Sequence, residues 1–336
     1  MNLAAQPTDP FTSSGKHGED LHAVVLAGGL AYEREVSLLS GRRVADALHR
    51  AGADALIVDA DADLVSRLTT MRPDAVFIAL HGSSGEDGAL RAVLDLLDVP
   101  YVGSSAVASR SAWDKPTAKA AVQAAGMATP DWVALPQTTF RELGANGVLA
   151  RLVDRFGLPL MVKPAQGGSA LGAALVTEVD DLPGAMVGCF SYGDTVLVER
   201  YVRGVEVAVS VLDDGTGPRA LPAVEIVAST GIFDYASRYT PGMTTYHTPA
   251  RLEPDVAERL AQAAVRAHET LGLRDLSRFD AIVDAHGEIQ FLEVNVAPGM
   301  TETSLFPMAV AGGGLDLGTV CVQLLQVAAA RSARSA

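Results

Sequence analysis

The segment SRFDAIVDAHGEIQFLEVN, residues 277–295, predicts two antiparallel strands joined by a tight Ala-His-Gly turn. Side chains alternate between the two faces of a strand, so Arg278 and Asp280 share one face, as do Glu293 and Asn295. Closing the hairpin brings Asp280 near Glu293 on the neighbouring strand. The segment therefore predicts two facing carboxylates at the end of an otherwise apolar hairpin.

Two facing carboxylates repel each other, and burial makes the repulsion stronger. A hard cation removes this conflict, and Mg²⁺ binds carboxylate oxygens together with waters and phosphate oxygens. The alternative is a solvated polar patch at the sheet edge, which the core-like residues between these groups argue against. Asp280, Glu293 and Asn295 are thus the predicted metal ligands.

A glycine-rich loop, VKPAQGGSALG at residues 162–172, supplies a candidate site for phosphate groups. Gly167 and Gly168 let the backbone approach an anion, and Lys163 ends the preceding strand. Two strands flank the loop, which favours a hairpin. The sequence WDKP places Lys115 near the first turn of a helix. Alone, the loop reads equally well as a simple turn and Lys115 as surface charge, but together with the predicted metal they favour a phosphorylated ligand.

Two acidic residues in VLVERYVRGVE, residues 196–206, lie at the end of a strand and after a glycine-containing turn. Glu199 and Glu206 are able to accept hydrogen bonds from an exocyclic amine or from ribose hydroxyls. They read equally as a pair of surface acids, which this segment alone does not exclude.

Apolar strands at residues 22–29, 54–60 and 74–82 alternate with helical segments, which predicts a mostly parallel sheet. Ligands bind at the carboxyl ends of such strands, where Glu33, His81 and Glu86 follow in sequence. The polar stretch at residues 229–252 has little apolar periodicity, and loops of that length are usually functional or disordered.

Composition excludes several classes of partner. The chain has 336 residues and a formal net charge of −14, so nucleic acid and anionic membranes are not expected partners. Cys189 and Cys321 form no CxxC pair and indicate a cytoplasmic protein without disulfides. Residues 1–20 lack an apolar core and are expected to form a flexible tail.

Taken together, the motifs resemble those of the D-alanine–D-alanine ligases in the ATP-grasp superfamily. The resemblance runs from about residue 22 to the C-terminus, and the motifs follow in the family's order: GGLAYEREVSLLSG, ALHGSSGEDGALRAVLDLLDVPYVGS, VKPAQGGSALG, DYASRY, SRFDAIVD and LEVNVAPGMTETSLFP. The implied fold is α/β and α+β, with an N-terminal parallel α/β domain at 21–104, a central lid domain at 105–203 and a C-terminal antiparallel-sheet domain at 204–336.

The resemblance implies an enzyme that uses ATP and two Mg²⁺ or Mn²⁺ ions to phosphorylate one D-alanine and join it to a second. Metal would be held by Asp280, Glu293 and Asn295. Nucleotide would be held by Lys115, Lys163, Gly168, Glu199, Glu206 and the backbone of Arg200, Tyr201 and Val202. A homodimer is typical of the family.

The resemblance also assigns the substrate groups. Glu33 would bind the first D-alanine's ammonium, with His81 nearby, and Ser304 and the Leu305 N–H would bind the second carboxylate. Arg278 and the Gly299 N–H would stabilise the oxyanion. Ser169, Tyr239 and Glu33 would form a latch that closes the 229–252 loop over the site.

Several positions depart from the family's usual pattern. Arg238 stands where a lysine is usual, and the other departures are Leu30, Ala31, Trp113, Ala170 and Val296. They keep open a related ATP-grasp ligase that joins D-alanine to another D-amino acid, or a paralogue that serves a specialised or self-resistance pathway. A non-catalytic nucleotide-binding relative is the third hypothesis, and the complete set of metal and oxyanion residues weighs against it.

Overall fold

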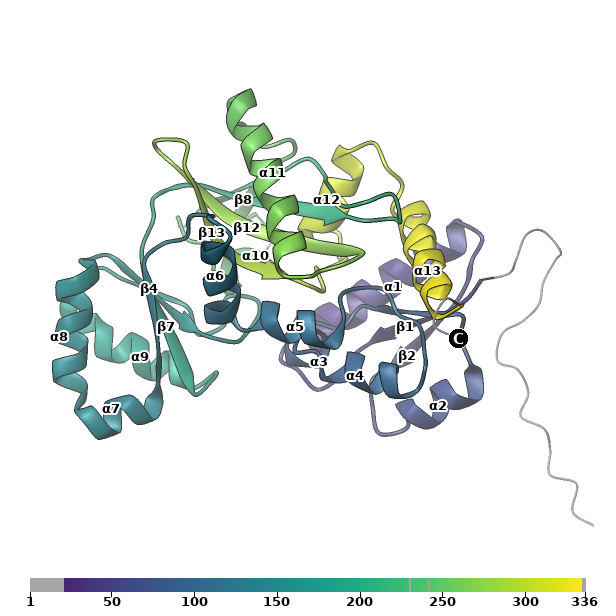
Figure 1. Ribbon diagram of the computed structural model, residues 1–336, viewed down its shortest axis with the longest axis horizontal. Coiled ribbons are helices and arrows are strands. Elements are labelled where there is room, and N and C mark those ends of the chain that lie inside the picture. Colours follow the sequence, from purple (N-terminus) through teal and green to yellow (C-terminus); the bar gives the residue numbers. More distant parts are fainter. Residues whose placement is uncertain (1–20, 230, 241, 334–336) are drawn as a thin grey trace, which may run out of the picture.

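The computed structural model describes residues 21–229, 231–240 and 242–333, which form three sheets (Figure 1). The predicted tail at 1–20 lies outside the described residues. In the first sheet, β1 (His22–Ala27) lies between β2 (Asp54–Asp59) and β3 (Ala75–Ile78), and both pairings are parallel. The predicted parallel unit is thereby confirmed. Its helices are α1 (Arg34–Arg50), α2 (Leu64–Met71), α3 (Ser83–Glu86) and α4 (Ala89–Leu96).

The second sheet is antiparallel and has the strand order β4-β7-β5-β6. Its strands are β4 (Trp132–Pro136), β5 (Leu160–Pro164), β6 (Ala174–Val176) and β7 (Thr195–Arg200). The glycine-rich loop connects β5 to β6, so the predicted hairpin is confirmed. The helices α7 (Gln137–Leu143), α8 (Ala145–Phe156) and α9 (Leu182–Phe190) accompany this sheet at the left of Figure 1, with a short 3-10 turn, Val179–Asp181, before α9.

The third sheet has the order β11-β10-β8-β12-β13, all antiparallel, with β9 (Arg219–Ala220) also paired to β8. Its strands are β8 (Gly204–Leu212), β10 (Val224–Ala228), β11 (Thr244–His247), β12 (Leu276–Asp284) and β13 (Ile289–Asn295). The last two form the hairpin predicted from 277–295. Their register pairs Asp280 with Glu293 and Arg278 with Asn295, and it shifts by a bulge after Asp280.

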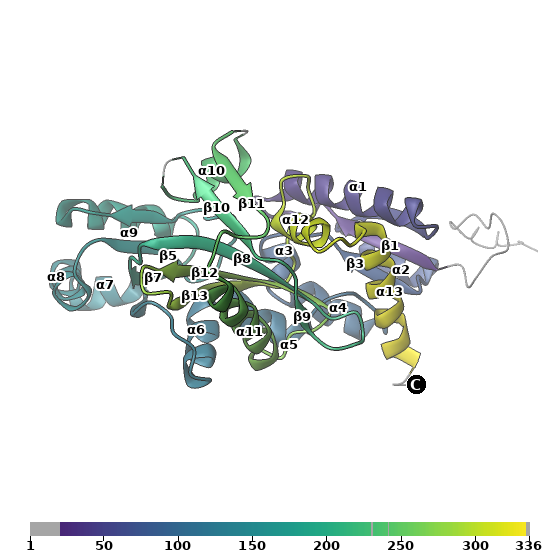
Figure 2. The same cartoon turned by 90° about the horizontal axis from the view of Figure 1, so that it is seen from above.

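Helices cover both faces of the third sheet (Figure 2). One core packs α5 (Ala106–Trp113), α6 (Lys115–Ala124) and α11 (Pro254–Thr270) against β8, β12 and β13. Another joins α12 (Leu305–Gly312) and α13 (Leu317–Ala333) to α1 and the first sheet. The cores therefore cross the limits predicted after residues 104 and 203, and those limits stay predictions.

The polar stretch at 229–252 is more ordered than its sequence suggests. It contains α10 (Tyr235–Tyr239) and β11, which pairs with β10. The pairing sets Thr245 opposite Val227, so the strand forms through a contact with a partner outside the stretch. Local periodicity alone carries no signal for such a pairing.

No single helix in the described part of the chain is long and apolar enough to cross a bilayer. The bent pair of α12 and α13 meets the length and composition criteria together. Both helices contribute side chains to the core that they share with α1.

Candidate active site

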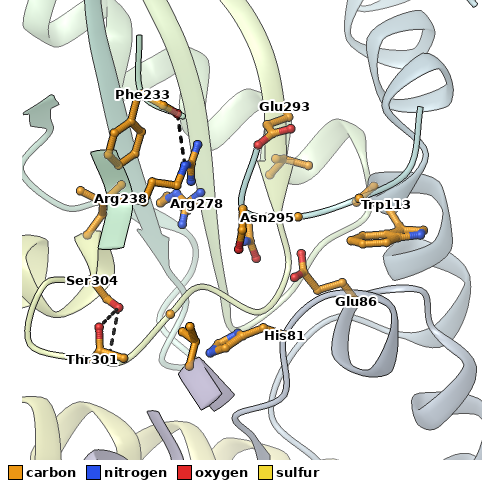
Figure 3. A pocket seen from close by; sticks show the side chains of 18 of the residues that line it. His81, Glu86, Trp113, Phe233, Arg238, Arg278, Glu293, Asn295, Thr301 and Ser304 are labelled. Carbon is orange, nitrogen blue, oxygen red and sulfur yellow. Dashed lines mark hydrogen bonds between the residues drawn. The ribbon is translucent and has the colours of Figure 1, made fainter. Parts of the chain in front are cut away.

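A cavity lies where the three sheets meet, and Figure 3 shows the side chains around it. The first sheet and its loops contribute His81 and Glu86, the glycine-rich loop contributes Gly168 and Ser169, and β12 with β13 contributes its polar end. The full lining is Val36, His81, Glu86, Ala112, Trp113, Lys115, Gly167, Gly168, Ser169, Phe233, Arg238, Tyr246, Arg278, Glu293, Val294, Asn295, Gly299, Thr301, Thr303, Ser304 and Leu305. Predicted site residues from distant segments are thus brought to one place.

Asp280 is stabilised by a neighbour on its own strand. The Arg278 guanidinium donates from Nε and Nη2 to the two Asp280 carboxylate oxygens, at 2.7 and 2.6 Å. Both side chains are buried, and residues two apart on a strand share a face. Strand alternation predicted that Arg278 and Asp280 share a face, but it did not predict the ion pair between them.

Glu293 faces several cations. Its Oε2 lies 3.2 Å from the Lys115 Nζ. Burial raises the pKa of Glu293, but the charges of Lys115, Lys163, Arg238 and Arg278 outweigh it and lower the pKa to about 2. The carboxylate is therefore ionised at neutral pH.

The predicted metal ligands form an oxygen-only set at the end of one hairpin. Asp280 and Glu293 are paired across the ladder, and the Asn295 Oδ1 accepts a hydrogen bond from the Ala297 N–H at 2.8 Å. Within residues 21–333, gaps excepted, no three His, Cys, Asp or Glu side chains form a metal cluster. Two carboxylates and an amide nevertheless match the donors that Mg²⁺ prefers when phosphate completes its shell.

The glycine-rich loop is tied to the start of α6. The Lys115 Nζ donates to the Gly167 carbonyl at 2.7 Å, and the Lys115 N–H donates to the Ala165 carbonyl at 3.0 Å. A Cβ on Gly168 would come within 2.7 Å of the Glu33 Oε1, so a larger residue there would displace that carboxylate. Lys115 therefore lies between the loop and Glu293.

Glu199 is buried between two lysines. Its Oε1 lies 2.5 Å from the Lys119 Nζ and its Oε2 lies 2.7 Å from the Lys163 Nζ. Both carboxylate oxygens therefore face protein cations. Lys119 was not among the predicted site residues, although its position four residues after Lys115 places it on the same helix face.

The segment after Glu199 is held by its backbone. The Arg200 N–H donates to the Asp131 carbonyl at 2.9 Å, and the Tyr201 N–H donates to the Pro159 carbonyl at 3.1 Å. Val202 follows and leads into β8, which carries Glu206. Burial raises the pKa of the Glu206 carboxyl to about 7.

Glu33, Ser169 and Glu86 lie together beside Gly82 and Gly168. The Ser169 side chain hydrogen-bonds the Glu33 carboxylate, whose pKa burial raises. The Gly82 N–H donates to the Glu86 carboxylate at 2.9 Å, and burial together with the Glu33 charge raises the pKa of Glu86 to about 8. Glu86 follows β3 in the sequence, and residues that follow the carboxyl end of a parallel strand commonly belong to a ligand-binding site.

The third predicted latch residue, Tyr239, ends α10, and its side chain lies outside what the structure describes. Ser169 and Ala170 have φ values of 54° and 57°, which is the left-handed region. The loop therefore turns sharply at the point where it meets Glu33.

His81 is hydrogen-bonded at both ring nitrogens. Its Nδ1 lies 3.1 Å from the Ala297 carbonyl, which only accepts, so Nδ1 carries the proton. Its Nε2 then accepts from the Ser40 hydroxyl at 2.9 Å, and the Ser40 oxygen accepts from the Met300 N–H at 3.1 Å. His81 thus lines the cavity while both nitrogens hold the loop that carries Gly299.

Gly299 and Ser304 pack tightly at the start of α12. A Cβ on Gly299 would lie 2.6 Å from the Ser304 Oγ. That oxygen accepts from the Thr301 N–H at 2.9 Å, and Leu305 is the first residue of α12. Ser304 and Leu305 line the cavity at this helix start, and a helix N-terminus favours negative charge.

Arg238 lies on α10 and lines the cavity. Its guanidinium carbon lies 4.2 Å from the centre of the Phe233 ring, and its Nε donates to the Phe233 carbonyl at 3.3 Å (Figure 3). The charge of Arg238 also contributes to the low pKa of Glu293 and opposes part of the rise that burial causes in the pKa of Glu206. The residue therefore faces the two carboxylates expected to flank a nucleotide.

Comparison with known proteins places this geometry in one family. The chain matches the family described as D-ala D-ala ligase N-terminus over residues 63–104 and that described as D-ala D-ala ligase C-terminus over residues 121–326. It is 41% identical to a D-alanine–D-alanine ligase of Anaeromyxobacter sp. over 92% of this chain and 97% of that protein. It is 40% identical to the ligase of Bordetella avium over 90% and 92% of the two chains.

Solved structures agree. A D-alanine–D-alanine ligase from Coxiella burnetii superposes with a TM-score of 0.79 at 27% identity, over 95% of this chain and 96% of that one. The Bacillus anthracis enzyme complexed with ATP gives a TM-score of 0.78 at 26% identity, over 95% and 100%. The fold is therefore the ATP-grasp fold expected from the motifs, and the chain belongs to the D-alanine–D-alanine ligase family.

Proposed function

We propose that this chain is an ATP-dependent ligase that joins two D-alanines into D-alanyl-D-alanine, for the synthesis of peptidoglycan precursors. The observation that carries the proposal is the polar end of the β12–β13 hairpin. There, two ionised or ion-paired carboxylates, an amide and several cations surround one cavity in a chain that belongs to this family. That arrangement suits the transfer of a phosphoryl group to a carboxylate.

The reaction has two steps. A carboxylate oxygen of the first D-alanine attacks the γ-phosphorus of ATP; the new O–P bond forms as the bond to the β-phosphate oxygen breaks, and ADP leaves. The amine of the second D-alanine, after losing a proton, then attacks the acyl carbon, and the tetrahedral intermediate collapses as the bond to phosphate breaks. The carboxylate needs this activation because it is a poor electrophile.

Two Mg²⁺ or Mn²⁺ ions are the metals that we propose for the site. Asp280, Glu293 and Asn295 would hold them, and when bound they would neutralise charge on the transferred phosphoryl group. Arg278 already pairs with Asp280, so it keeps that carboxylate in place. Its remaining donors, together with the Gly299 N–H, would stabilise the oxyanion of the second step.

For the nucleotide, we propose that Lys115, Lys163 and the Gly168 N–H bind the phosphates. Lys115 lies between the loop and Glu293, which supports this assignment. Because two lysines take up the Glu199 carboxylate, the main chain from Glu199 to Val202, through Arg200 and Tyr201, is the part that would hold the base. Glu206 would accept from the ribose hydroxyls.

For the amino acids, we propose that Glu33 binds the first ammonium and that Ser304 with the Leu305 N–H binds the second carboxylate. His81 acts by holding the Gly299 loop, because both of its nitrogens have protein partners. The closure of 229–252 over the acyl phosphate, with Tyr239 meeting Ser169 and Glu33, would exclude water.

A second candidate function has a specific observation in its favour. The VanG D-Ala:D-Ser ligase of Enterococcus faecalis superposes with a TM-score of 0.77 at 27% identity, over 92% of this chain and 99% of that one. The same fold therefore accepts another second substrate in that protein. Arg238 faces the cavity where a lysine is usual, and its planar fork differs in reach from an ammonium.

The test is a substrate panel. Purified enzyme is incubated with ATP, Mg²⁺ and D-alanine, alone or with D-serine, D-lactate or another D-amino acid, while phosphate release and product mass are measured. We expect phosphate and D-alanyl-D-alanine with D-alanine alone, and neither when ATP, Mg²⁺ or D-alanine is omitted. Absence of phosphate release with D-alanine contradicts the proposal, and a preferred mixed product would support the second candidate.

We also propose that the enzyme works in the cytoplasm, where ATP is available, and that it is a homodimer. Light scattering of the purified chain tests the second point. A mass near 34.9 kDa would contradict it. The domain limits proposed at 21–104, 105–203 and 204–336 are testable by limited proteolysis.

A further inference from the structure

Lys119 is the most buried cation near the cavity. Its side chain is fully buried on α6, and its Nζ lies 2.5 Å from the Glu199 Oε1. It also donates to the Thr129 hydroxyl and, at 3.3 Å, to the Phe291 carbonyl. Lys119 therefore connects α6, the second sheet and β13. Its side chain does not line the cavity.

The position of Lys119 matters because Glu199 also pairs with Lys163 through its second carboxylate oxygen. The Glu199 Oε2 lies 2.7 Å from Lys163, and Glu293 and Glu206 also act on the Lys163 charge. With Lys119 present, Glu199 is balanced by a cation that no ligand reaches. Without it, Lys163 would be the only cation among the described residues that pairs with Glu199, in a region where screening by water is weak.

We propose that Lys119 is a positioning residue for the nucleotide. By pairing with the Oε1 of Glu199 it neutralises that carboxylate, and this leaves the charge of Lys163 available to the phosphates. This inference rests on the proposed function, because it takes the phosphates to lie beside Lys163. It assigns the role to a buried side chain that touches neither nucleotide nor amino acid.

Three variants separate this role from simple packing. Lys119→Met keeps the length of the side chain and removes its charge, Lys119→Arg keeps the charge, and Lys119→Met with Glu199→Gln removes both charges of the pair. Thr129→Val is the matched control, since it removes a hydrogen-bond partner of Lys119 and no charge. Calorimetry measures the binding of Mg²⁺–ADP and, separately, of adenosine, which has no phosphate.

We expect Lys119→Met to weaken ADP binding by about tenfold or more and adenosine binding by less than about twofold. Lys119→Arg and Thr129→Val should bind ADP nearly as the native chain does. The double variant should recover most of the lost ADP affinity, because Glu199 then no longer competes for Lys163. A purely structural role would lower adenosine and ADP binding together and would not be rescued by Glu199→Gln.

The double variant decides the question if Lys119→Met fails to fold. In the double variant Lys163 still faces the charges of Glu293 and Glu206, so it is not left as an isolated buried charge. A folded double variant that binds ADP about tenfold more weakly than the native chain overturns the inference. Phosphate release by the native chain with D-alanine is measured in parallel, so a failure of the proposed function is seen separately.

Discussion

Three carboxylates at or beside the cavity are paired with cations, and this pairing explains how their charges are accommodated. Asp280 is held by Arg278, Glu293 faces Lys115, and Glu199 lies between Lys119 and Lys163. An unpaired buried charge costs several kcal/mol, whereas a paired one is tolerated. The pairs therefore offset the cost of burying these carboxylates.

Replacing Glu293 by glutamine tests the metal assignment. We expect Glu293→Gln to lower turnover by at least about a hundredfold, because an amide is a weaker ligand than a carboxylate. The fold should survive, since the site also loses a repulsion with Asp280. Phosphate release and circular dichroism measure the two effects. Near-native turnover in a folded variant would remove Glu293 from the metal site.

The buried imidazole of His81 predicts a pH dependence of stability. Burial lowers the pKa of His81 from 6.5 to about 4, with Arg278 also disfavouring the charged form. The unfolded chain therefore binds a proton that the folded chain does not. Stability from this group is complete above pH 6.5 and is lost as the pH falls toward 4, by roughly 3 kcal/mol at most.

Urea unfolding of the native chain and of His81→Gln, at pH 7.5 and 5, isolates this contribution. The neighbouring Glu86 has a raised pKa and acts in the opposite direction, since its stabilisation is lost as the pH rises from 4.5 to 8. The comparison between the two proteins cancels it. Equal pH slopes in the two proteins would show that His81 is not buried as a neutral ring.

At the scale of elements, the site forms where loops from different sheets contact one another. The β5–β6 loop reaches Glu33 on the first unit, and the Ser40–His81 pair holds the loop after β13 to α1 and β3. These loops come from three sheets, and each is fixed by backbone groups as well as by side chains. The stretch at 229–252, with α10 and β11, is joined to these elements through β10.

The close approach of the glycine-rich loop to Glu33 is testable at Gly168. Its φ lies outside the left-handed region, so alanine fits the backbone, but the new Cβ would displace the Glu33 carboxylate. We expect Gly168→Ala to raise the KM for D-alanine by about tenfold or more with little loss of stability. Steady-state kinetics and thermal unfolding measure these two quantities.

Gly147→Ala is the matched control for that variant. Gly147 lies inside α8, where a Cβ meets no atom within 4 Å. Alanine there should stabilise the protein by about 0.4–1 kcal/mol and leave the kinetics unchanged. A Gly168→Ala enzyme with native kinetics would show that the loop does not press on Glu33.

On the scale of the whole molecule, the C-terminal helix ties the first and third sheets together. Asp275 is buried just before β12 and accepts from Arg331 on α13 at 2.6 and 2.8 Å. It also accepts from the Gly103 N–H at 2.6 Å. One carboxylate thus connects the end of the chain, the first unit and the sheet that carries the site.

Asp275→Asn should therefore destabilise the protein by roughly 2 to 4 kcal/mol, because it removes the charge of a buried carboxylate that accepts from both Arg331 and Gly103. Phosphate release at 25 °C should persist, since Asp275 does not line the cavity. Asp154→Asn, in the exposed pair with Arg151, is the control and should change stability little. Urea unfolding compares the two. Equal stabilities would mean that the connection contributes nothing measurable.

The sequence by itself determined the parallel first sheet, the β5–β6 and β12–β13 hairpins and the facing of Asp280 and Glu293. These follow from local patterns, because apolar runs, glycine-rich turns and strand alternation act over a few residues. The motifs and their order also indicated the family, which the relatives confirm. The roles of the individual site residues remain predictions.

Only the tertiary structure decided which cation each carboxylate meets. Lys119 and Glu199 are far apart in the sequence, and Ser40 and Met300 come from opposite ends of the chain. It also placed β11 against β10 and joined α13 to the first unit. Such contacts depend on which elements pack together, and a burial or charge pattern within one element does not specify its partner.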